Sequence, residues 1–318
     1  MSATPPGVPD RGPDLSGLRP ALPSPLRPVD DERFARRGVT LLLKRDDLIH
    51  PDLPGNKWRK LAPNIAAAAG RPLLTFGGAY SNHLRATAAA GRLLGFGTVG
   101  IVRGDELAGR PLNPSLARCA ADGMRLRFVD RGTYRAKDEP GVLAELLRGH
   151  EDCVVVPEGG SNAPAARGCT ELGRELRGAA DVVAVACGTG GTLAGLAAGL
   201  APGQHALGVP VLRGGFLGDT VRALQHEAFG GPAGDWRLEE RFHFGGYART
   251  TPALHAFADA FEDRHGLPVE RLYVAKLLYA LTALAEEGAF PAGTTVAAVV
   301  TGRPEPAGDA PAQPDSSR

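Results

Sequence analysis

Short apolar runs that alternate with helix-length segments constrain the fold of this chain more than any other feature. The runs "PLLTFGG", "GTVGIVRG", "DVVAVACG" and "HALGVPVLRG" each precede a segment with helical composition, and "TVAAVVTG" closes the series. Short apolar runs punctuated by glycine are typical of βαβ units whose parallel strands are buried on both faces. The pattern predicts an α/β fold of the doubly wound kind.

The size and charge of the chain favour a small molecule as partner. Its 318 residues suffice for two domains or one large one. Lysine plus arginine (36) nearly cancels aspartate plus glutamate (35), which does not favour nucleic acid or an anionic membrane. No apolar run approaches the ~20 residues that span a bilayer, and "MSATPPGVPDRGPDL" lacks the pattern of a targeting signal. We therefore expect a cytoplasmic protein.

The cysteines show no pattern of a metal site or of a disulfide framework. Cys119, Cys153, Cys169 and Cys187 include no Cys-x-x-Cys pair. A chain of this length does not need disulfides to fold. We expect reduced thiols and no bound metal.

Both ends of the chain differ in composition from its centre. Residues 1–30 are rich in proline, and residues 303–318 combine proline, alanine, glycine and aspartate. Such compositions bury too little apolar surface to offset the entropy lost on ordering. We expect a proline-rich N-terminal segment, part of which wraps the body, and a disordered tail at 303–318.

A lysine directly behind a Gly-Asn turn is the first candidate for chemistry. In "PGNKWRKL", Lys57 is followed by Trp58, Arg59 and Lys60. A lysine in a basic cluster is usually a solvated surface residue. A covalent role needs a free amine, and crowding by Arg59 and Lys60 with shielding by Trp58 would lower the pKa of Lys57 from its reference value of about 10.4.

The turn after "VVAVA" indicates an anion site. Its sequence, "CGTGGTLAGL", places three glycines and two threonines between a buried strand and a helix, where backbone N–H groups and the helix dipole favour an anion. It lacks the Gly-Lys-Ser/Thr of a nucleotide P-loop and the acidic residue of a dinucleotide fold. A phosphate monoester is the favoured ligand, and a tight turn that needs glycine for packing alone is the alternative.

The turn after "LLTF" places polar side chains at a second helix start. Ser81 and Asn82 in "GGAYSNHL" fit the N-cap region, and capping alone explains such residues in most proteins. They could also present donors to a carboxylate or a ring oxygen. His83 is better explained as a helix-start residue bonded to backbone than as a base.

Together, these three turns match the needs of an enzyme that uses pyridoxal 5′-phosphate. Ligands of such sheets bind at the carboxyl ends of the strands. The lysine would supply the amine for a Schiff base, the glycine-rich loop would hold the phosphate, and the polar turn would hold the substrate carboxylate.

Five segments, in the same order, resemble the 1-aminocyclopropane-1-carboxylate deaminase/D-cysteine desulfhydrase family of pyridoxal-phosphate enzymes. They are "LLKRDDLIHPDLPGNKWRKL", "LTFGGAYSNHLRATAAAG", "PEGGSNAPAARGCTEL", "VACGTGGTLAGL" and "FHFGGYAR". The resemblance implies a tryptophan-synthase-β-like fold, in which two open, mostly parallel, twisted sheets are flanked by helices and the cofactor lies in the cleft between two domains. We assign residues 31–60 and 158–302 to a large cofactor-binding domain and residues 61–157 to a small domain, and expect a homodimer.

The resemblance also implies roles for matched positions. Lys57 matches the Schiff-base lysine, and Lys60 matches a basic residue near the cofactor phosphate. Ser81 matches a residue near the substrate carboxylate, and Asn82 matches the hydrogen-bond partner of the cofactor's 3′-oxygen. The phosphate loop of the family matches Gly188, Thr189, Gly190, Gly191 and Thr192.

Two tyrosines that face the substrate in this family match Tyr247 and Tyr273. Beside the second, relatives read "VYTGK" where this chain has "LYVAK", so Val274 supplies no polar group for the pyridine nitrogen. The closing His-Thr-Gly-Gly motif is reduced to "VVTGRPEP", which leaves the hydroxyl of Thr301 for that nitrogen. These departures bear on the substrate and on turnover.

We expect a pyridoxal-phosphate-dependent lyase or deaminase that converts a small amino acid to a 2-keto acid and ammonia. D-cysteine would lose sulfide by β-elimination, whereas 1-aminocyclopropane-1-carboxylate would need ring opening by a nucleophile such as a tyrosine. The first is the less demanding chemistry. A racemase or β-replacement enzyme of the same fold and a non-catalytic cofactor-binding protein are the alternatives.

Overall fold

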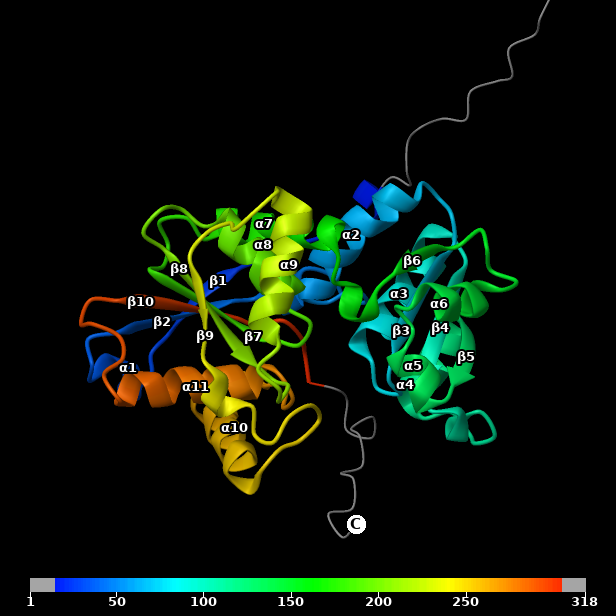
Figure 1. Cartoon of the computed structure of the whole chain (residues 1–318). Coiled ribbons are helices and arrows are strands. Elements are labelled where there is room, and N and C mark those ends of the chain that lie inside the picture. The colour runs from blue at the N-terminus through cyan, green and yellow to red at the C-terminus, as the bar shows by residue number, and fades with distance from the viewer. Residues whose placement is uncertain (1–14, 305–318) are drawn as a thin grey trace, which may run out of the picture.

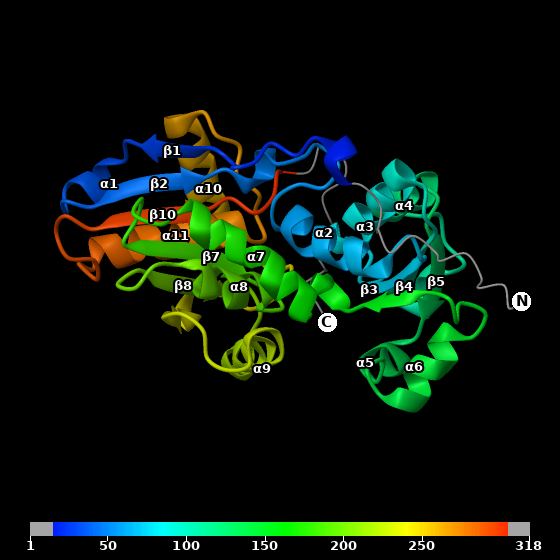
Figure 2. The same cartoon turned by 90° about the horizontal axis from the view of Figure 1, so that it is seen from above.

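Two sheets lie side by side in the computed structural model of the chain, which describes residues 15–304 (Figure 1, Figure 2). The expectations for residues 1–14 and 305–318 lie outside the described residues. The five apolar runs singled out above all form strands of these sheets, and nearly all strand pairs are parallel. The expected α/β class with two mostly parallel sheets is confirmed.

The larger sheet contains, in spatial order, β1 (Leu26–Val29), β2 (Thr40–Lys44), β10 (Thr295–Val299), β7 (Val182–Cys187), β8 (His205–Pro210) and β9 (Trp236–Leu238). Strand β1 is antiparallel to β2 and comes from the proline-rich segment, so residues 26–29 of that segment belong to the body. One face is covered by α1 (Glu32–Ala35), α10 (Pro252–His265) and α11 (Val274–Glu286). The other is covered by α7 (Ala163–Glu175), α8 (Gly191–Gly199) and α9 (Leu217–Phe229).

The smaller sheet contains, in spatial order, β5 (Arg125–Val129), β4 (Thr98–Arg103), β3 (Leu73–Gly77) and β6 (Val154–Val156). One face packs against α2 (Asn56–Ala68), α3 (Asn82–Leu94) and α4 (Pro114–Ala121). The other packs against α5 (Arg131–Arg135) and α6 (Pro140–Leu147). Short 3-10 helices lie at η1 (Leu15–Leu18), η2 (Asp46–Leu48), η3 (Asp105–Leu107), η4 (Glu158–Gly160) and η5 (Glu240–Phe242).

Strand β7 shows why these strands read as continuous apolar runs. Ala184 and Ala186 pack into the core below α11, whereas Val183 and Val185 pack into the core below α8. Successive side chains of a strand point to opposite faces, and here both faces are covered by helices. Every position of the strand is therefore apolar. The division into a large and a small domain, with the boundaries given above, remains a proposal.

None of the described helices combines the length and the apolar character that crossing a membrane requires.

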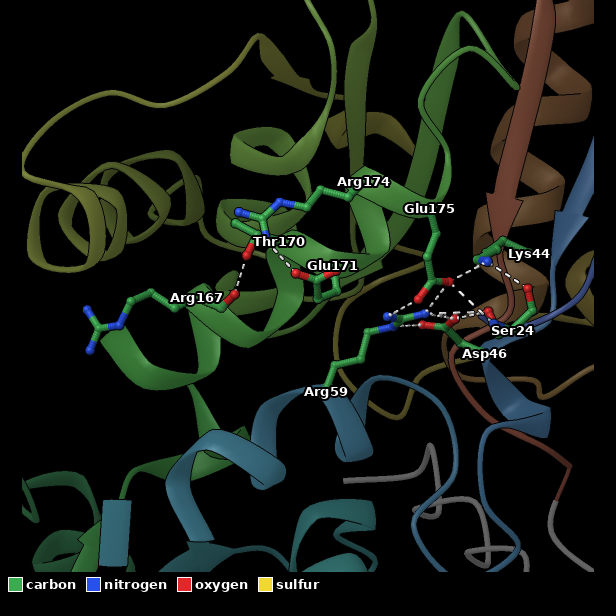
Figure 3. A network of polar contacts seen from close by, with 9 residues as sticks. All are labelled: Ser24, Lys44, Asp46, Arg59, Arg167, Thr170, Glu171, Arg174 and Glu175. Carbon is green, nitrogen blue, oxygen red and sulfur yellow. Dashed lines mark hydrogen bonds and ion pairs between the residues drawn. The ribbon is translucent and has the colours of Figure 1, made fainter. Parts of the chain in front are cut away.

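A buried polar network joins helix α2 to the larger sheet (Figure 3). The guanidinium of Arg59 donates to both carboxylate oxygens of Asp46 at 2.7 and 2.8 Å and to those of Glu175 at 2.9 and 3.0 Å. Lys44 forms a 2.5 Å ion pair with Glu175 and donates to the Ser24 carbonyl at 2.7 Å. Two cations thus face two carboxylates, so the burial of each charge is compensated.

We expect Arg59→Met to lower the free energy of unfolding by about 3–5 kcal/mol, because it leaves the carboxylate of Asp46 buried without its charged partner. Urea unfolding measures the loss. Arg174→Met is the matched control, because Arg174 pairs with Glu171 on the exposed side of α7 in the same view and its side chain is 55% exposed. The control should change stability by no more than about 0.5 kcal/mol. Equal losses in the two variants would contradict the role of the network.

Candidate active site

The turn that carries Lys57 packs against the backbone that follows β10. Gly55 has φ of 65°, and its N–H donates to the carbonyl of Asp46 at 2.9 Å. A Cβ atom at Gly55 would lie 1.8 Å from the carbonyl oxygen of Thr301. Only glycine permits this approach and this φ. The "GN" of the turn therefore places Lys57, at the start of α2, beside the carboxyl end of β10.

The amine of Lys57 is held in a form that suits chemistry. Its Nζ donates to the side-chain oxygen of Asn56 at 2.9 Å. Burial, followed by repulsion from Lys60, lowers the pKa of Lys57 to about 7. Near neutral pH, much of this lysine therefore carries a free amine, the form that attacks a carbonyl carbon.

The prediction that Arg59 helps to lower the pKa of Lys57 is wrong. Its guanidinium is paired with Asp46 and Glu175 in the buried network, so its charge is already compensated. The side chain of Lys60, one helical turn beyond Lys57, supplies the repulsion instead.

Lys60 is a buried cation whose contacts within the described residues are uncharged. It is 3% exposed, and its Nζ donates to the carbonyl of Gly159 at 3.1 Å and to the hydroxyl of Ser161 at 2.9 Å. Burial lowers the pKa of Lys60. A buried ammonium that faces only neutral oxygens favours an anionic ligand beside it.

The turn that contains Gly159 and Ser161 joins Lys60 to the glycine-rich loop. The hydroxyls of Ser161 and Thr189 are hydrogen-bonded, and a Cβ atom at Gly191 would lie 2.7 Å from the Ser161 hydroxyl oxygen. The amide of Asn56 donates to the hydroxyl of Thr192 at 3.1 Å. Of these two neighbours of the loop, Asn56 belongs to the helix that carries Lys57, and Ser161 accepts a hydrogen bond from Lys60 of the same helix.

The loop itself satisfies the requirements of an anion site and of a packed turn. Helix α8 begins at Gly191 with no side chain capping its first N–H groups, so a phosphate at this end would find free donors and a favourable dipole. Gly190 has φ of 79°, and a Cβ atom there would lie 2.9 Å from the side chain of Val221 on α9. Gly190 is therefore also required for packing, and the two interpretations of the loop do not exclude each other.

The two tyrosines lie together near this loop. The rings of Tyr247 and Tyr273 meet edge to face, with centroids 6.4 Å apart. A Cβ atom at Gly188 would lie 3.6 Å from the hydroxyl of Tyr273. Burial, followed by the proximity of Tyr247 and Glu270, raises the pKa of Tyr273 well above its usual value. Its hydroxyl stays protonated near neutral pH and can donate a proton.

The polar turn after β3 begins α3. Ser81 caps this helix by accepting from the N–H of Leu84 at 3.2 Å, and the oxygen of Asn82 accepts from Arg85. Ser81 therefore has the capping role that was the alternative to a role in ligand binding.

His83 connects this turn to the rest of the site. Its Nε2 is 2.8 Å from the hydroxyl of Thr75, not bonded to backbone as expected, and its ring packs on Gly160. Burial, followed by the charges of Lys57 and Lys60, lowers the pKa of His83 well below its usual value. The first turn of α3 therefore lies within electrostatic reach of both lysines.

Val274 and Thr301, at the two positions where the sequence departs from the family motifs, lie in different surroundings. Val274 is 1% exposed and belongs to the apolar core between α11 and the sheet, so a hydroxyl at this position would enter an apolar environment. Thr301 follows β10 and is 9% exposed, and its carbonyl contacts the lysine turn. Of these two residues, Thr301 is the one placed beside Lys57.

Sequence reasoning missed Glu270. Its carboxylate accepts from the backbone N–H groups of Leu272 and Tyr273 at 2.7 Å and of Val274 at 3.2 Å, which fixes the start of α11 and hence Tyr273. It also raises the pKa of Lys57 against the effects of burial and Lys60. An acidic residue three positions before Tyr273, the N-cap of α11, was the available signal.

The donor set around Lys57 fits a small phosphate monoester that carries a carbonyl group. A partly deprotonated amine, a buried cation, an uncapped helix start and a protonated tyrosine lie on neighbouring elements. Contacts between neighbouring residues link these groups: Asn56 bonds Thr192 of the loop, and Ser161 bonds both Lys60 and Thr189. Gly55 packs on Thr301, and Gly188 of the loop lies near Tyr273.

The chain is similar in sequence and in structure to several known proteins. D-cysteine desulfhydrase of Yersinia pestis (strain Pestoides F) is 35% identical over 197 residues, which cover 55% of this chain and 58% of that protein. The mitochondrial bifunctional D-cysteine desulfhydrase/1-aminocyclopropane-1-carboxylate deaminase of Arabidopsis thaliana is 32% identical over 183 residues, 51% of this chain and 45% of that one. A crystal structure described as an ACC deaminase homologue superimposes with a TM-score of 0.75 at 25% identity, covering 88% and 89% of the two chains.

Residues 19–302 match the family described as "Pyridoxal-phosphate dependent enzyme". This match spans both sheets and every residue of the candidate site. The chain therefore belongs to the pyridoxal-phosphate dependent enzymes.

Proposed function

We propose that this protein is a pyridoxal-phosphate-dependent lyase or deaminase that releases a 2-keto acid and ammonia from a small amino acid. The observation that carries the proposal is the amine of Lys57, whose pKa is about 7. The same helix carries the buried cation Lys60, which bonds Ser161, and Ser161 in turn bonds Thr189 of the glycine-rich loop. The relatives are named for D-cysteine and for a cyclopropane amino acid, and these names favour a small amino acid as substrate.

The roles proposed for the binding residues are those that the family resemblance implies. Lys57 would bind the cofactor covalently, Lys60 and the loop from Gly188 to Thr192 would hold its phosphate, and Asn82 would bond its 3′-oxygen. Thr301 would supply the hydroxyl for its ring nitrogen. When bound, the cofactor supplies an electron sink for the charge that develops at the substrate α-carbon.

The protein's own groups would bind the substrate and move its protons. Ser81 and the N–H groups at the start of α3 hold the substrate carboxylate. The amine of Lys57, once free, takes the α-proton, because its pKa lies close to neutral pH. The hydroxyls of Tyr247 and Tyr273 face the leaving group.

The high pKa of Tyr273 favours β-elimination over ring opening. A nucleophilic tyrosine must lose its proton, and burial opposes that loss at this position. A protonated tyrosine can instead assist a departing thiolate. We therefore propose a D-cysteine-like substrate with a leaving group on its β-carbon.

The shift of Lys57 predicts how stability depends on pH in the cofactor-free protein. An unfolded lysine binds its proton up to about pH 10.4, whereas folded Lys57 releases it at about pH 7. Between these values the unfolded chain binds the extra proton, so the free energy of unfolding rises with pH, and the cost of burying the ammonium is felt fully below about pH 7. Lys57→Met removes that cost.

The gain in stability of Lys57→Met over wild type should therefore be larger at about pH 6 than at about pH 9. Urea unfolding of the two cofactor-free proteins at both pH values measures it. A gain that is the same at both values would show that Lys57 titrates normally.

Keto-acid release from a panel of amino acids tests the reaction. We expect release from D-cysteine and β-chloro-D-alanine and little from 1-aminocyclopropane-1-carboxylate. Tyr273→Phe should lower kcat by about 10²-fold or more if its hydroxyl transfers a proton, and Lys57→Ala should abolish turnover. Release from the cyclopropane substrate alone would contradict the elimination proposal, and release from none would favour a non-catalytic binding protein.

The proposal includes a homodimer located in the cytoplasm. Support comes from the family resemblance. Sedimentation of the purified protein tests the dimer, and a monomer across micromolar concentrations would contradict it.

A further inference from the structure

Lys276 is a buried cation that takes no part in the proposed chemistry. It is 0% exposed on the first turn of α11. Its Nζ donates to the backbone carbonyls of His243 and Gly246, each at 2.9 Å. Burial lowers the pKa of Lys276 to about 8. A fully buried ammonium that donates to two carbonyls of one loop holds that loop through charge-assisted hydrogen bonds.

The loop it holds is strained. Four of its residues have positive φ: 53° at Phe244, 88° at Gly245, 117° at Gly246 and 55° at Ala248. For residues other than glycine this conformation is unfavourable and persists only where the surroundings impose it. Tyr247 lies within this strained stretch and is 41% exposed.

Two sets of contacts from α11 impose the conformation. Near the start of the loop, Phe244 packs edge to face on Tyr279, with ring centroids 5.0 Å apart. At its centre, within the described residues, the hydrogen bonds that reach the backbone of 243–248 from another element come from Lys276. Without Lys276, the carbonyls of His243 and Gly246, at the two ends of the positive-φ stretch from Phe244 to Gly246, would lose this partner.

We propose that Lys276 is the positioning residue of Tyr247. The first turn of α11 carries Tyr273 at its N-cap and Lys276 three residues later, so one helix end places both tyrosines. Glu270 fixes this helix end through three backbone N–H groups, and Lys276 fixes the loop to it. The catalytic importance of this arrangement rests on the proposed function, whereas the hold on the loop does not.

Amide hydrogen exchange of the cofactor-free and the cofactor-loaded protein tests the proposal without turnover. Lys276→Met keeps the length of the side chain but removes every donor, and exchange within 243–249 should rise about tenfold or more. Lys276→Gln retains an uncharged donor and should give a smaller rise in the same segment. Thr282→Val is the control, because Thr282 is a buried polar residue of the same helix whose hydroxyl donates to the carbonyl of Leu278, one turn earlier in that helix. It should leave 243–249 unchanged.

Kinetics of the loaded enzyme give a second readout. With cofactor content unchanged, Lys276→Met should lower kcat/KM about tenfold or more, and Lys276→Gln should restore part of the loss. If no amino acid is turned over, the proposed function fails while the exchange experiment still decides the role of Lys276.

Two results would overturn the proposal. One is exchange within 243–249 that matches wild type in the Met and Gln variants. The other is a rise spread evenly over α10 and α11, which would mean that Lys276 stabilises this part of the fold in general. If Lys276→Met does not fold, the comparison of Lys276→Gln with Thr282→Val decides between the same outcomes.

Discussion

The buried ion pairs of Arg59 connect the two halves of the molecule. Helix α2 packs its apolar side, including Leu61 and Ile65, into the core of the smaller sheet. Through Arg59, the same helix bonds to Asp46 beyond β2 and to Glu175 at the end of α7, which belong to the larger sheet. The start of α2 is therefore fixed to both sheets, and Lys57 lies at that start.

The charges of α2 are compensated on one side of the helix and not on the other. Arg59 faces two carboxylates, whereas the partners of the Lys60 ammonium among residues 15–304 are the neutral oxygens of Gly159 and Ser161. This asymmetry accounts for both properties of the site. After burial, which has the larger effect, it lowers the pKa of Lys57, and it leaves positive charge close to an uncapped helix start, where an anion is favoured.

The parts of this arrangement that local sequence governs could be predicted. Strands β7 and β8 are buried on both faces, so their apolar runs could be recognised in the sequence. The glycine of "PGNK" indicated a turn, and in the structure Gly55 makes this turn against Thr301. The sequence also placed Lys57, the glycine-rich loop and the polar helix start at the carboxyl ends of strands. Each of these features depends on residues close together in the chain.

Long-range partners could not be predicted. Arg59 was expected to repel Lys57, but its pairing with Glu175, 116 residues away, removes that effect. Lys276 bonds carbonyls 33 and 30 residues before it, and backbone acceptors leave no mark in a sequence. Val274 was read as a missing polar group near the cofactor, whereas its side chain packs in the core. Such contacts arise only when the sheets are assembled.

The most direct test of the account is to locate the cofactor on the chain. The purified protein, loaded with pyridoxal 5′-phosphate, is reduced with borohydride and digested, and the modified peptide is identified by mass spectrometry. We expect the adduct on Lys57, and in Lys60→Met we expect the same site with weaker retention of the cofactor on dialysis. An adduct on Lys60 or any other lysine, with Lys57 unmodified, would contradict the account.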